Sequence, residues 1–560
     1  MIEDLAQHCA QATDLVPALM TTETIANPEY DPAKASRQAS EEKKDVAKTD
    51  ISPEKTEWFP SGQLTVPLAT TMTRTSAVIS SVLLFALVAR GAPTVQLGQT
   101  AVVGRSIPTF SQEFFAGIPY AEPPLGDLRF RPPVLKTSLN ATTLDAAQYG
   151  PSCIQPLGGS TPGGLPTSFA LSEDCLTVNI LRPAGVDSTS KLPVMFWTYG
   201  GGFLSGSSVV YNGSTIVEQS VARGTPVVFV SFNYRLGPLG FPQGQEAMDQ
   251  GALNLGIKDQ IAALEWVQRN IGKFGGDKRK VTAFGQSAGS ILTSILFLNK
   301  RVDKLARAAI FESGSQATVA IFPATRRQNI WTSFVAGVPS CASLAKAHLT
   351  FSCLRNVTTQ ELLEGLLTSL AETNEQVPFN PVIDGPEGLI PDLPSRLLSQ
   401  GKFSRIPFIA GTNLDEGTAL TSQLINSTAA INASLISGRT PSVSPTLLQS
   451  SIKKLLELYP DVPALGSPYG TGNNTFGLSS QYKRASAIEG DLDFHSQRRL
   501  WIEAAANAGV TTFGYLFTQP QPNGLPQLGV AHGSEVFYVF GTPADTSSAS
   551  VTISRIMTDF

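Results

Sequence analysis

The stretch VTAFGQSAGS constrains the fold of this chain more than any other feature of the sequence. Val281–Phe284 is apolar and β-rich, which predicts a strand, and Ser290–Leu298 predicts a helix directly after it. Between the two, Gly285, Ser287 and Gly289 form a G-x-S-x-G pattern. Only glycines at the flanking positions let a strand and the next helix approach so closely around a strained central residue. We therefore expect Ser287 at the carboxyl edge of a sheet, as a candidate nucleophile.

Strand-like and helix-like segments alternate around this stretch. The runs 192–198 (LPVMFWT) and 226–233 (PVVFVSFN) are almost continuously apolar, which is typical of strands covered on both faces. Residues 255–274 carry apolar side chains at helical spacing until two glycines stop the run. Further strands are predicted over 306–311, 406–410 and 512–517. This order predicts an α/β fold with a mostly parallel sheet and helices on both faces.

Three consecutive glycines, Gly200 to Gly202, follow the predicted strand 192–198 directly. Without Cβ atoms, their backbone N–H groups can face the negative charge that develops on a carbonyl oxygen under nucleophilic attack. We expect the amides of Gly201, Gly202 and Ala288 to form this oxyanion hole. The alternative is a flexible turn, and the nearby serine motif favours the oxyanion hole.

A serine nucleophile needs a base, and the chain has only four histidines. His8 lies in a polar leader, and His348 lies between two cysteines. For a serine on such a strand-to-helix turn, the order along the chain is serine, acid, base, which leaves His495 and His532. His495 lies in the charged segment DLDFHSQRRL, where a solvated or capping role is ordinary, whereas His532 follows a Gly- and Pro-rich loop. His532 is the preferred base.

The acid partner should follow a strand between the serine and the histidine. Glu416, in GTNLDEGT just after the strand 406–410, satisfies both requirements. Its neighbour Asp415 is the first alternative, and Asp384 in PVIDGP is the second. A lone carboxylate in such a loop is usually only solvated, so the serine and histidine carry this assignment.

The amino-terminal part has a different composition. Residues 1–71 hold 12 acids and 6 bases with little hydrophobic periodicity, which predicts a disordered extension. Met72 then precedes the uncharged run Ala77–Ala89, which would span about 20 Å as a helix and fall short of a bilayer core of about 30 Å. Residues 72–92 therefore predict a signal peptide with Met72 as the natural start, ahead of a catalytic domain over 93–560. A signal anchor is the alternative.

Acceptor motifs and cysteines also indicate secretion. Six Asn-x-Ser/Thr acceptors follow the predicted signal, at Asn140, Asn212, Asn356, Asn426, Asn432 and Asn473. Outside the leader the cysteines are Cys153, Cys175, Cys341 and Cys353. Four cysteines allow three pairings, of which the local one closes two short loops; the alternative is four free thiols. Their spacing fits no zinc site, so we expect no metal.

Charge and motifs exclude several function classes. The net charge of −4 over 560 residues is too small to suggest a polyanion, so nucleic acid is not an expected partner. The segment GALNLGIK superficially resembles a phosphate loop, but Ile257 stands where lysine is required. We therefore expect no nucleotide and no other cofactor.

Several separated blocks resemble one known family, the type-B carboxylesterases and lipases of the α/β-hydrolase fold, with its fungal secreted members nearest. The blocks are GIPYAEPPLGDLRFRPP from Gly117, SEDCLTVNI from Ser172, YGGGF from Tyr199, NYRLGPLGF from Asn233 and ALEWVQRNIGKFGGD from Ala263, together with GQSAG. The resemblance implies Ser287 as nucleophile, Glu416 as acid and His532 as base. It also implies two disulfides and two buried ion pairs, namely Cys153–Cys175, Cys341–Cys353, Arg129–Glu173 and Arg235–Asp259.

The sequence departs from the family pattern in three places. Gln286 stands where the family usually has glutamate, which removes a negative charge beside the nucleophile. The loop CIQPLGGSTPGGLPTSFALSEDC, which carries a lid helix in similar lipases, is short and broken by Gly and Pro. The chain stops at ISRIMTDF, partway through what resembles the last helix of the family, so we expect the catalytic domain to be truncated.

Together these features predict a secreted serine hydrolase that cleaves carboxylic esters through an acyl-enzyme. The small lid favours soluble esters over oil droplets, with at most transient contact with a lipid interface. The alternatives are a catalytically inactive binding or adhesion relative and an unstable truncated product. Acyl length, the alcohol moiety and the oligomeric state stay open.

Overall fold

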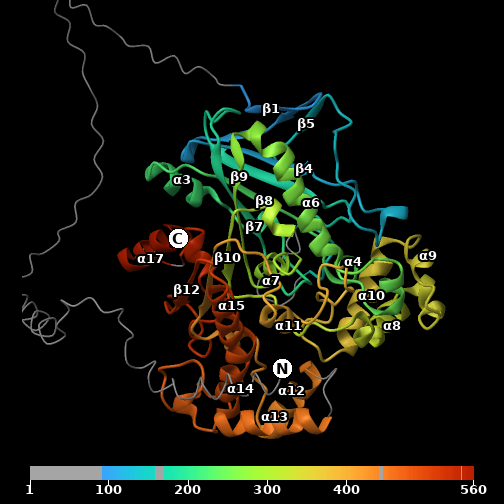
Figure 1. Cartoon of the computed structure of the whole chain (residues 1–560), viewed down its shortest axis with the longest axis vertical. Coiled ribbons are helices and arrows are strands. Elements are labelled where there is room, and N and C mark those ends of the chain that lie inside the picture. The colour runs from blue at the N-terminus through green and yellow to red at the C-terminus, as the bar shows by residue number, and fades with distance from the viewer. Residues whose placement is uncertain are drawn as a thin grey trace, which may run out of the picture. The chain divides into compact units, whose positions relative to one another are not determined.

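A computed structural model describes residues 91–157, 169–299, 301–439, 445–543, 545 and 547–559 (Figure 1). The predicted extension 1–71, most of the predicted signal peptide 72–92 and the middle of the predicted lid loop lie outside these residues. None of the described helices is long and apolar enough to cross a bilayer. Within the same residues, no group of three or more His, Cys, Asp or Glu side chains could hold a metal ion.

A sheet of nine strands organises the molecule. In space the strands follow the order β12-β11-β10-β9-β7-β8-β6-β4-β3, and those from β12 to β8 run parallel while β6, β4 and β3 pair antiparallel. Their bounds are β3 Arg105–Ile107, β4 Gln112–Pro119, β6 Thr177–Pro183, β7 Leu192–Thr198, β8 Val228–Phe232, β9 Gly276–Gln286, β10 Ala308–Glu312, β11 Phe408–Asn413 and β12 Thr512–Phe517. A separate sheet joins β1 Thr94–Leu97, β2 Thr100–Val103 and β5 Thr143–Asp145. The prediction of a mostly parallel sheet is confirmed.

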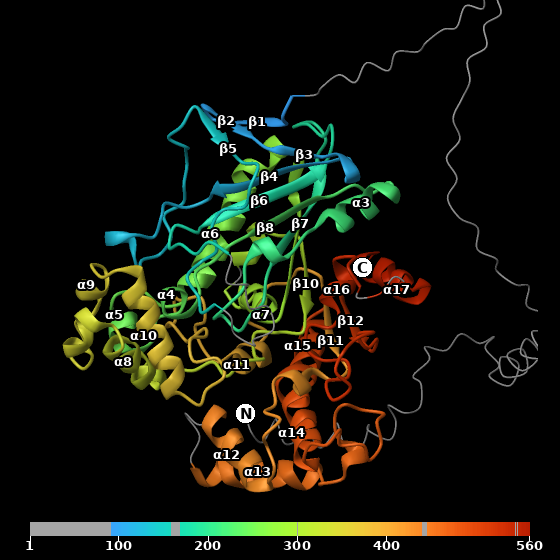
Figure 2. The same ribbon diagram turned by 180° about the vertical axis from the view of Figure 1, so that it is seen from behind.

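Helices cover both faces of the large sheet. Both views place α6 on one side of the strands and α3 on the other (Figures 1 and 2), as the sequence predicts. The helices are α3 Ser214–Ala222, α4 Gly237–Gly240, α5 Gly244–Asp249, α6 Leu255–Asn270, α7 Ala288–Ile295, α8 Gln328–Ala336, α9 Phe351–Leu354, α10 Thr359–Glu372, α11 Pro394–Ser399, α12 Thr428–Arg439, α13 Pro445–Leu458, α14 Ser480–Gly490, α15 Ser496–Asn507, α16 Val536–Val539 and α17 Ser548–Asp559.

The central strands are continuously apolar because they are buried on both faces. Every residue of β8 is buried, and α6 buries the side chains of Ile257, Leu264 and Val267. Aromatic rings from neighbouring strands meet in this core: Phe196 of β7 stacks on Phe232 of β8 with centroids 4.9 Å apart. Each such side chain contributes about 1.5–3 kcal/mol when it is fully buried, so the sheet forms a rigid platform.

Several element boundaries differ from the predicted ones, and two of these differences lie in the elements that flank the serine. Strand β9 begins at Gly276, five residues before the predicted start. The strand extends through polar residues at its beginning, and Gly276 pairs with Leu192 of β7. Helix α7 begins at Ala288 rather than Ser290, so the turn at the serine is shorter than the pattern alone predicts. The serine is therefore the residue directly before the helix.

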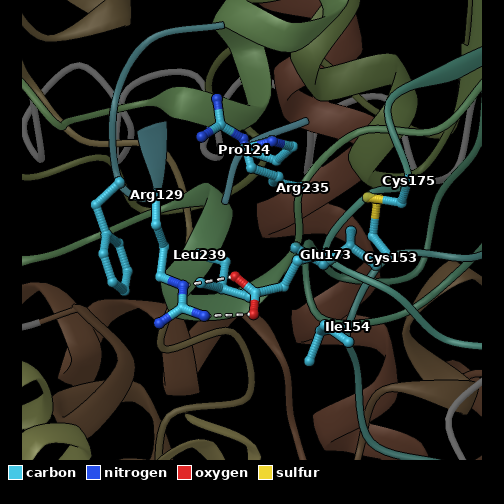
Figure 3. Close-up of a pocket in the computed structure, with 10 residues that line it drawn as sticks. Pro124, Arg129, Cys153, Ile154, Glu173, Cys175, Arg235 and Leu239 are labelled. Carbon is cyan, nitrogen blue, oxygen red and sulfur yellow. Dashed lines mark hydrogen bonds and ion pairs between the residues drawn. A yellow bond between two sulfur atoms is a disulfide. The ribbon is translucent and has the colours of Figure 1, made fainter. Parts of the chain in front are cut away.

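A structural cluster lies beside the first disulfide (Figure 3). Arg129 donates from Nε and Nη2 to the two carboxylate oxygens of Glu173, at 2.7 and 2.8 Å. Both side chains line a cavity with about 10 Å³ of free space, which is room for about one water molecule. It is too small for a substrate, so we interpret this cluster as support for the fold.

The structure contains the other covalent and ionic links that the family resemblance implies. Arg235 donates to both oxygens of Asp259 at 2.8 and 2.6 Å, and both side chains are almost fully buried. The disulfides are Cys153–Cys175 and Cys341–Cys353. Removing one partner of a buried ion pair such as Arg235–Asp259 typically costs about 3–5 kcal/mol of stability.

The glycosylation acceptors differ in exposure. Asn140, Asn212, Asn356, Asn426 and Asn473 are exposed. Asn432 on α12 is half-buried, and its Oδ1 is buried without a hydrogen-bond partner among the described residues. The five exposed side chains are open to modification in the folded chain, whereas Asn432 would have to be modified before α12 packs.

Candidate active site

The turn between β9 and α7 holds Ser287 in a strained conformation, with φ 55° and ψ −127°. The glycines on either side are required by the neighbouring strand β7. A Cβ on Gly285 would lie 2.5 Å from the carbonyl oxygen of Thr198, and one on Gly289 would lie 2.0 Å from the same atom. Both distances are too short for any side chain, so the close approach of three segments fixes the serine.

The imidazole of His532 lies against this serine. Its Nε2 is 2.8 Å from Ser287 Oγ, although the two residues are 245 positions apart in the chain. The histidine follows the long loop after β12, and its side chain is 7% exposed. The ring of Phe494 covers one face of the imidazole, with centroids 4.8 Å apart. His532 is therefore held in a position from which it can take the serine proton.

The carboxylate of Glu416 lies on the other side of the imidazole. Its Oε2 is 2.6 Å from His532 Nδ1, and its Oε1 accepts a hydrogen bond of 2.6 Å from the backbone N–H of Asn413. Glu416 begins a 3-10 turn three residues after β11 ends, and its side chain is fully buried. Ser287, His532 and Glu416 thus form a continuous hydrogen-bonded chain at the carboxyl ends of β9, β11 and β12.

The other carboxylates that the sequence offered are engaged elsewhere. Asp415 accepts from the side chain of Ser467 and from the backbone N–H of Val530, at 2.8 and 2.9 Å, and so braces the loop before the histidine. Asp384 bonds to Asn254 Nδ2 at 2.9 Å. It lines a separate groove of about 700 Å³. Neither carboxylate forms a hydrogen bond with His532 in the described part of the chain.

The second candidate histidine, His495, lies close by but forms its hydrogen bond with a different set of side chains. His495 ends a π-helical turn, Asp491–His495, and its Nδ1 is 3.1 Å from Thr412 Oγ1. It is half-buried rather than solvated, and it directly precedes α15 without a side-chain capping hydrogen bond. The described contacts of His495 do not include Ser287.

The expected oxyanion-hole residues adjoin positions beside the serine: Ala288 follows Ser287 directly, and a Cβ on Gly200, the residue before Gly201, would lie 2.8 Å from Ser287 Cβ. Gly201 and Gly202 have φ of 109° and 62°, which ordinary side chains rarely adopt. A Cβ on Gly201 would lie 2.1 Å from the carbonyl oxygen of Ser205. Ala288 is the first residue of α7, where backbone N–H groups have no partner inside the helix. The three amides are therefore held by backbone packing rather than by side chains.

Charges in the site favour an ionised acid and a basic histidine. Burial favours the neutral form of Glu416, but the charge and hydrogen bond of His532 outweigh it and hold the pKa of Glu416 below its ordinary value. Burial would likewise lower the pKa of His532, yet the charge and hydrogen bond of Glu416 raise it above 6.5. The pair therefore stabilises the imidazolium that forms when a base takes a proton.

A second layer of residues was not identified from the sequence. Glu535 is fully buried, accepts from the side-chain amide of Asn413, and lies 3.5 Å from Ser313 Oγ. Burial and then the charge of Glu416 raise the pKa of Glu535 to about 7. Phe494 is also new, and its place on a π-helical turn is a feature often found at functional sites. No local pattern marks these residues, although Glu535 follows the histidine by three positions.

A mostly parallel sheet with helices on both faces, and a serine, a histidine and a carboxylate hydrogen-bonded at its carboxyl edge, define an α/β-hydrolase. The model of the Carboxylesterase family matches residues 91–560. The chain belongs to this family, and it is a carboxylic ester hydrolase.

Individual relatives agree with this membership. The chain is 35% identical to Lipase 2 of Geotrichum candidum over 472 residues, covering 76% of this chain and 80% of the relative. It is also 35% identical to Secreted lipase 1 of Botryotinia fuckeliana, covering 82% and 83%. The crystal structure of Aspergillus niger EstA superposes with a TM-score of 0.69 at 27% identity, covering 82% of this chain and 84% of that one.

Proposed function

We propose that Ser287 is the nucleophile, His532 the general base and Glu416 the acid of this ester hydrolase, with the amides of Gly201, Gly202 and Ala288 as oxyanion donors. The distances of 2.8 Å from Ser287 Oγ to His532 Nε2 and 2.6 Å from His532 Nδ1 to Glu416 Oε2 carry this proposal. They connect a hydroxyl to a buried carboxylate through one imidazole. That arrangement lets a proton pass from the serine hydroxyl to the imidazole without any movement of the backbone.

The acylation step begins when Ser287 Oγ bonds to the ester carbonyl carbon and its proton passes to His532 Nε2. The carbonyl electron pair moves to the former carbonyl oxygen, where the backbone amides stabilise it. The bond to the alcohol oxygen then breaks, and the imidazolium gives its proton to the departing alcohol. An acyl-serine remains, and Glu416 has stayed ionised throughout.

Deacylation repeats these steps with water. His532 takes a proton from a water molecule as the water oxygen bonds to the acyl carbon, and the same amides receive the oxyanion. The bond to Ser287 Oγ breaks, and the serine regains its proton from the imidazolium. The products are a free carboxylic acid and the resting enzyme, and no cofactor enters the balance.

The proposed substrates are soluble esters of carboxylic acids. A Cβ on Gly202 would lie 3.3 Å from the side chain of Val377, so an apolar residue stands beside the proposed oxyanion hole. The broken loop between Cys153 and Cys175 supports a preference for soluble esters. Triacylglycerol is the second candidate, because two relatives are named as lipases and a further one as a secreted triacylglycerol lipase.

The proposed location is extracellular. The predicted signal peptide over 72–92, the two disulfides and the names of the secreted relatives support this proposal. The catalytic domain over 93–560 would then fold in an oxidising compartment. Intact-mass analysis of protein secreted from a eukaryotic host tests it, because a mature chain beginning near Ala92 supports the signal peptide and one retaining residues 72–92 contradicts it.

Hydrolysis of 4-nitrophenyl butyrate tests the proposed nucleophile. The change Ser287→Ala should abolish turnover while the thermal unfolding midpoint stays near that of the unchanged chain. Ser290→Ala is the matched control, because Ser290 lies three residues further on in α7 and its Oγ donates to the carbonyl of Gly314. Turnover that survives in Ser287→Ala would rule out this serine.

A comparison of two substrates tests the proposed substrate class. Glyceryl tributyrate below its solubility limit should be turned over at least as fast as it is above that limit. A sharp rise in rate when droplets form would identify a lipase instead, and the soluble-ester preference would be wrong.

A further inference from the structure

The side chain of Gln286 lies between two glycines beside the proposed base. Gln286 ends strand β9 and is 6% exposed. A Cβ on Gly200 would lie 2.8 Å from its Oε1, and a Cβ on Gly533 would lie 3.6 Å from its Nε2. The missing side chain of Gly200 leaves the space that the amide occupies, whereas a Cβ on Gly533 would be in ordinary van der Waals contact with it.

The amide nitrogen of Gln286 is 3.3 Å from Nε2 of His532, the atom that also faces the serine. Because Glu416 is 2.6 Å from Nδ1, the resting imidazole carries its proton on Nδ1 and presents a lone pair at Nε2. An amide N–H₂ group is only a donor. Gln286 and Ser287 therefore both offer a proton to the same lone pair.

We propose that Gln286 is a positioning residue that tunes His532 as a base, because its amide donates to the neutral imidazole and has no bond to offer the imidazolium. This inference rests on the proposed role of His532. When Nε2 takes a proton it becomes a donor, and the two N–H groups then face each other. The amide thus favours the neutral ring, in opposition to Glu416.

Other charged groups around the ring act in the opposite direction. Glu416 faces Nδ1 directly, and the buried Glu535 also favours a charged imidazole. Glu312 on β10 pairs with Gln286 across the two strands, and burial raises the pKa of Glu312 well above its ordinary value, which favours its neutral form. Phe494 covers a ring face and carries no charge. Among the side chains that face His532 here, Gln286 is the one that disfavours the imidazolium.

This opposition has two consequences for turnover. A smaller fraction of the free enzyme rests as imidazolium at mildly acidic pH, so more of it can accept the serine proton. The imidazolium that forms during acylation is also a stronger acid, and it therefore gives its proton to the departing alcohol more readily. Both effects extend activity toward lower pH.

The pH profile of kcat/KM tests the proposal, because its acid limb reports the pKa of the base in the free enzyme. Gln286→Met keeps the length of the side chain and removes the donor. It should move the acid limb upward by about 0.5–1 pH unit, which lowers kcat/KM about three- to ten-fold below the midpoint. Gln286→Glu adds a negative acceptor and should move the limb further than Gln286→Met.

Gln260→Met is the matched control. Gln260 on α6 is fully buried and donates to the hydroxyls of Thr198 and Thr293, so its loss removes a buried amide without touching His532. The acid limb of the Gln260→Met profile should coincide with that of the unchanged enzyme, even if the thermal unfolding midpoint of this variant falls. An acid limb for Gln286→Met that coincides with the unchanged enzyme would overturn the proposal, as would a downward shift in Gln286→Glu.

A fluorophosphonate probe separates failure of this inference from failure of the proposed function. All three variants and the unchanged enzyme should become labelled on Ser287. Labelling with coincident pH profiles would reject only the role of Gln286. Absence of labelling on Ser287 in the unchanged, folded enzyme would reject the proposed catalytic residues, and the inference with them.

Discussion

The two halves of the active site are built in different ways. The nucleophile half, Gly200–Gly202 and Gly285–Ser290, is fixed by backbone contacts in the rigid centre of the sheet, where a Cβ on Gly289 would lie 2.0 Å from Thr198 O. The base half, Asn413–Glu416, Phe494 and His532–Glu535, is fixed by side chains from three separate segments of the chain. Changes in the first half should therefore alter the backbone, while changes in the second should alter proton transfer.

The base half also holds the ionisable side chains of the site. Its residues Glu416 and Glu535 are both fully buried, and Asn413 donates to both of them. The nucleophile half holds no ionisable side chain, and Gln286 is its closest polar contact with the imidazole. The comparison predicts that the pH dependence of activity is set by the ionisable groups of the base half. Gln286 of the nucleophile half then adjusts that dependence.

The largest effect is expected for the base. His532→Ala should lower kcat for 4-nitrophenyl butyrate on the order of 10⁴- to 10⁶-fold, because the serine then has no proton acceptor. His495→Ala, which loses only a bond to Thr412, should cost far less. If His495→Ala were the more damaging change, the assignment of the base half would be wrong.

The next largest effect is expected in the proposed oxyanion hole. Gly201→Ala places a methyl group 2.1 Å from Ser205 O, which must displace the backbone amides. We expect kcat to fall about 10²- to 10³-fold, as for the loss of one oxyanion donor. Steady-state kinetics separates this fall in kcat from a change in KM.

Gly224→Ala serves as the control for backbone strain. Gly224 has φ of 75° and nothing within 4 Å of its Cβ position, and it lies away from the site, between α3 and β8. Its alanine variant should lose about 1 kcal/mol of stability and keep its kcat. Equal kcat values for the two alanine variants would show that the nucleophile half does not depend on backbone placement.

A smaller effect is expected from Phe494. Phe494→Ala removes the ring that covers the face of His532 and admits water beside it. A ring pair is worth about 0.5–1.5 kcal/mol, so we expect kcat/KM to fall up to about ten-fold, and Phe494→Leu should recover part of it. An unchanged kcat/KM in Phe494→Ala would show that Phe494 does not contribute to the base half, which would then consist only of its hydrogen-bonded residues.

The smallest effect on turnover is expected from Glu535. Its main effect is on how the free energy of unfolding depends on pH. Its pKa of about 7 in the folded state exceeds the ordinary value of 4.5, so the folded chain holds a proton that the unfolded chain has lost in between. The stability from this group is therefore present below pH 4.5 and decreases as the pH rises to 7. Glu535→Gln, which cannot ionise, should show a flatter decrease in urea unfolding across this range. Parallel curves would contradict the buried neutral acid.

The sequence predicts the nucleophile half more completely than the base half. The glycines around Ser287 and the run Gly200–Gly202 are local signals, because the close contacts that they permit involve only neighbouring strands. Strand β7 also has the predicted bounds, since a continuous apolar run marks a buried strand. Strand β12 has the predicted bounds too, although it is the mostly exposed edge strand of the sheet.

The base half depends on distances along the chain that no local pattern specifies. His532 and Glu416 are 116 positions apart, and chain order together with loop composition singled them out among few candidates. Phe494, Asn413 and Glu535 were not predicted, because their roles follow from a π-helical turn and a shared burial site. Such features arise from tertiary packing and leave no periodicity in the sequence.

Mapping the covalent adduct of a fluorophosphonate by peptide mass spectrometry tests the central claim directly. The account predicts one phosphonate per folded chain, on Ser287, with labelling slowed by several orders of magnitude in His532→Ala. An adduct on another serine, or labelling on Ser287 at an unchanged rate in His532→Ala, would contradict it.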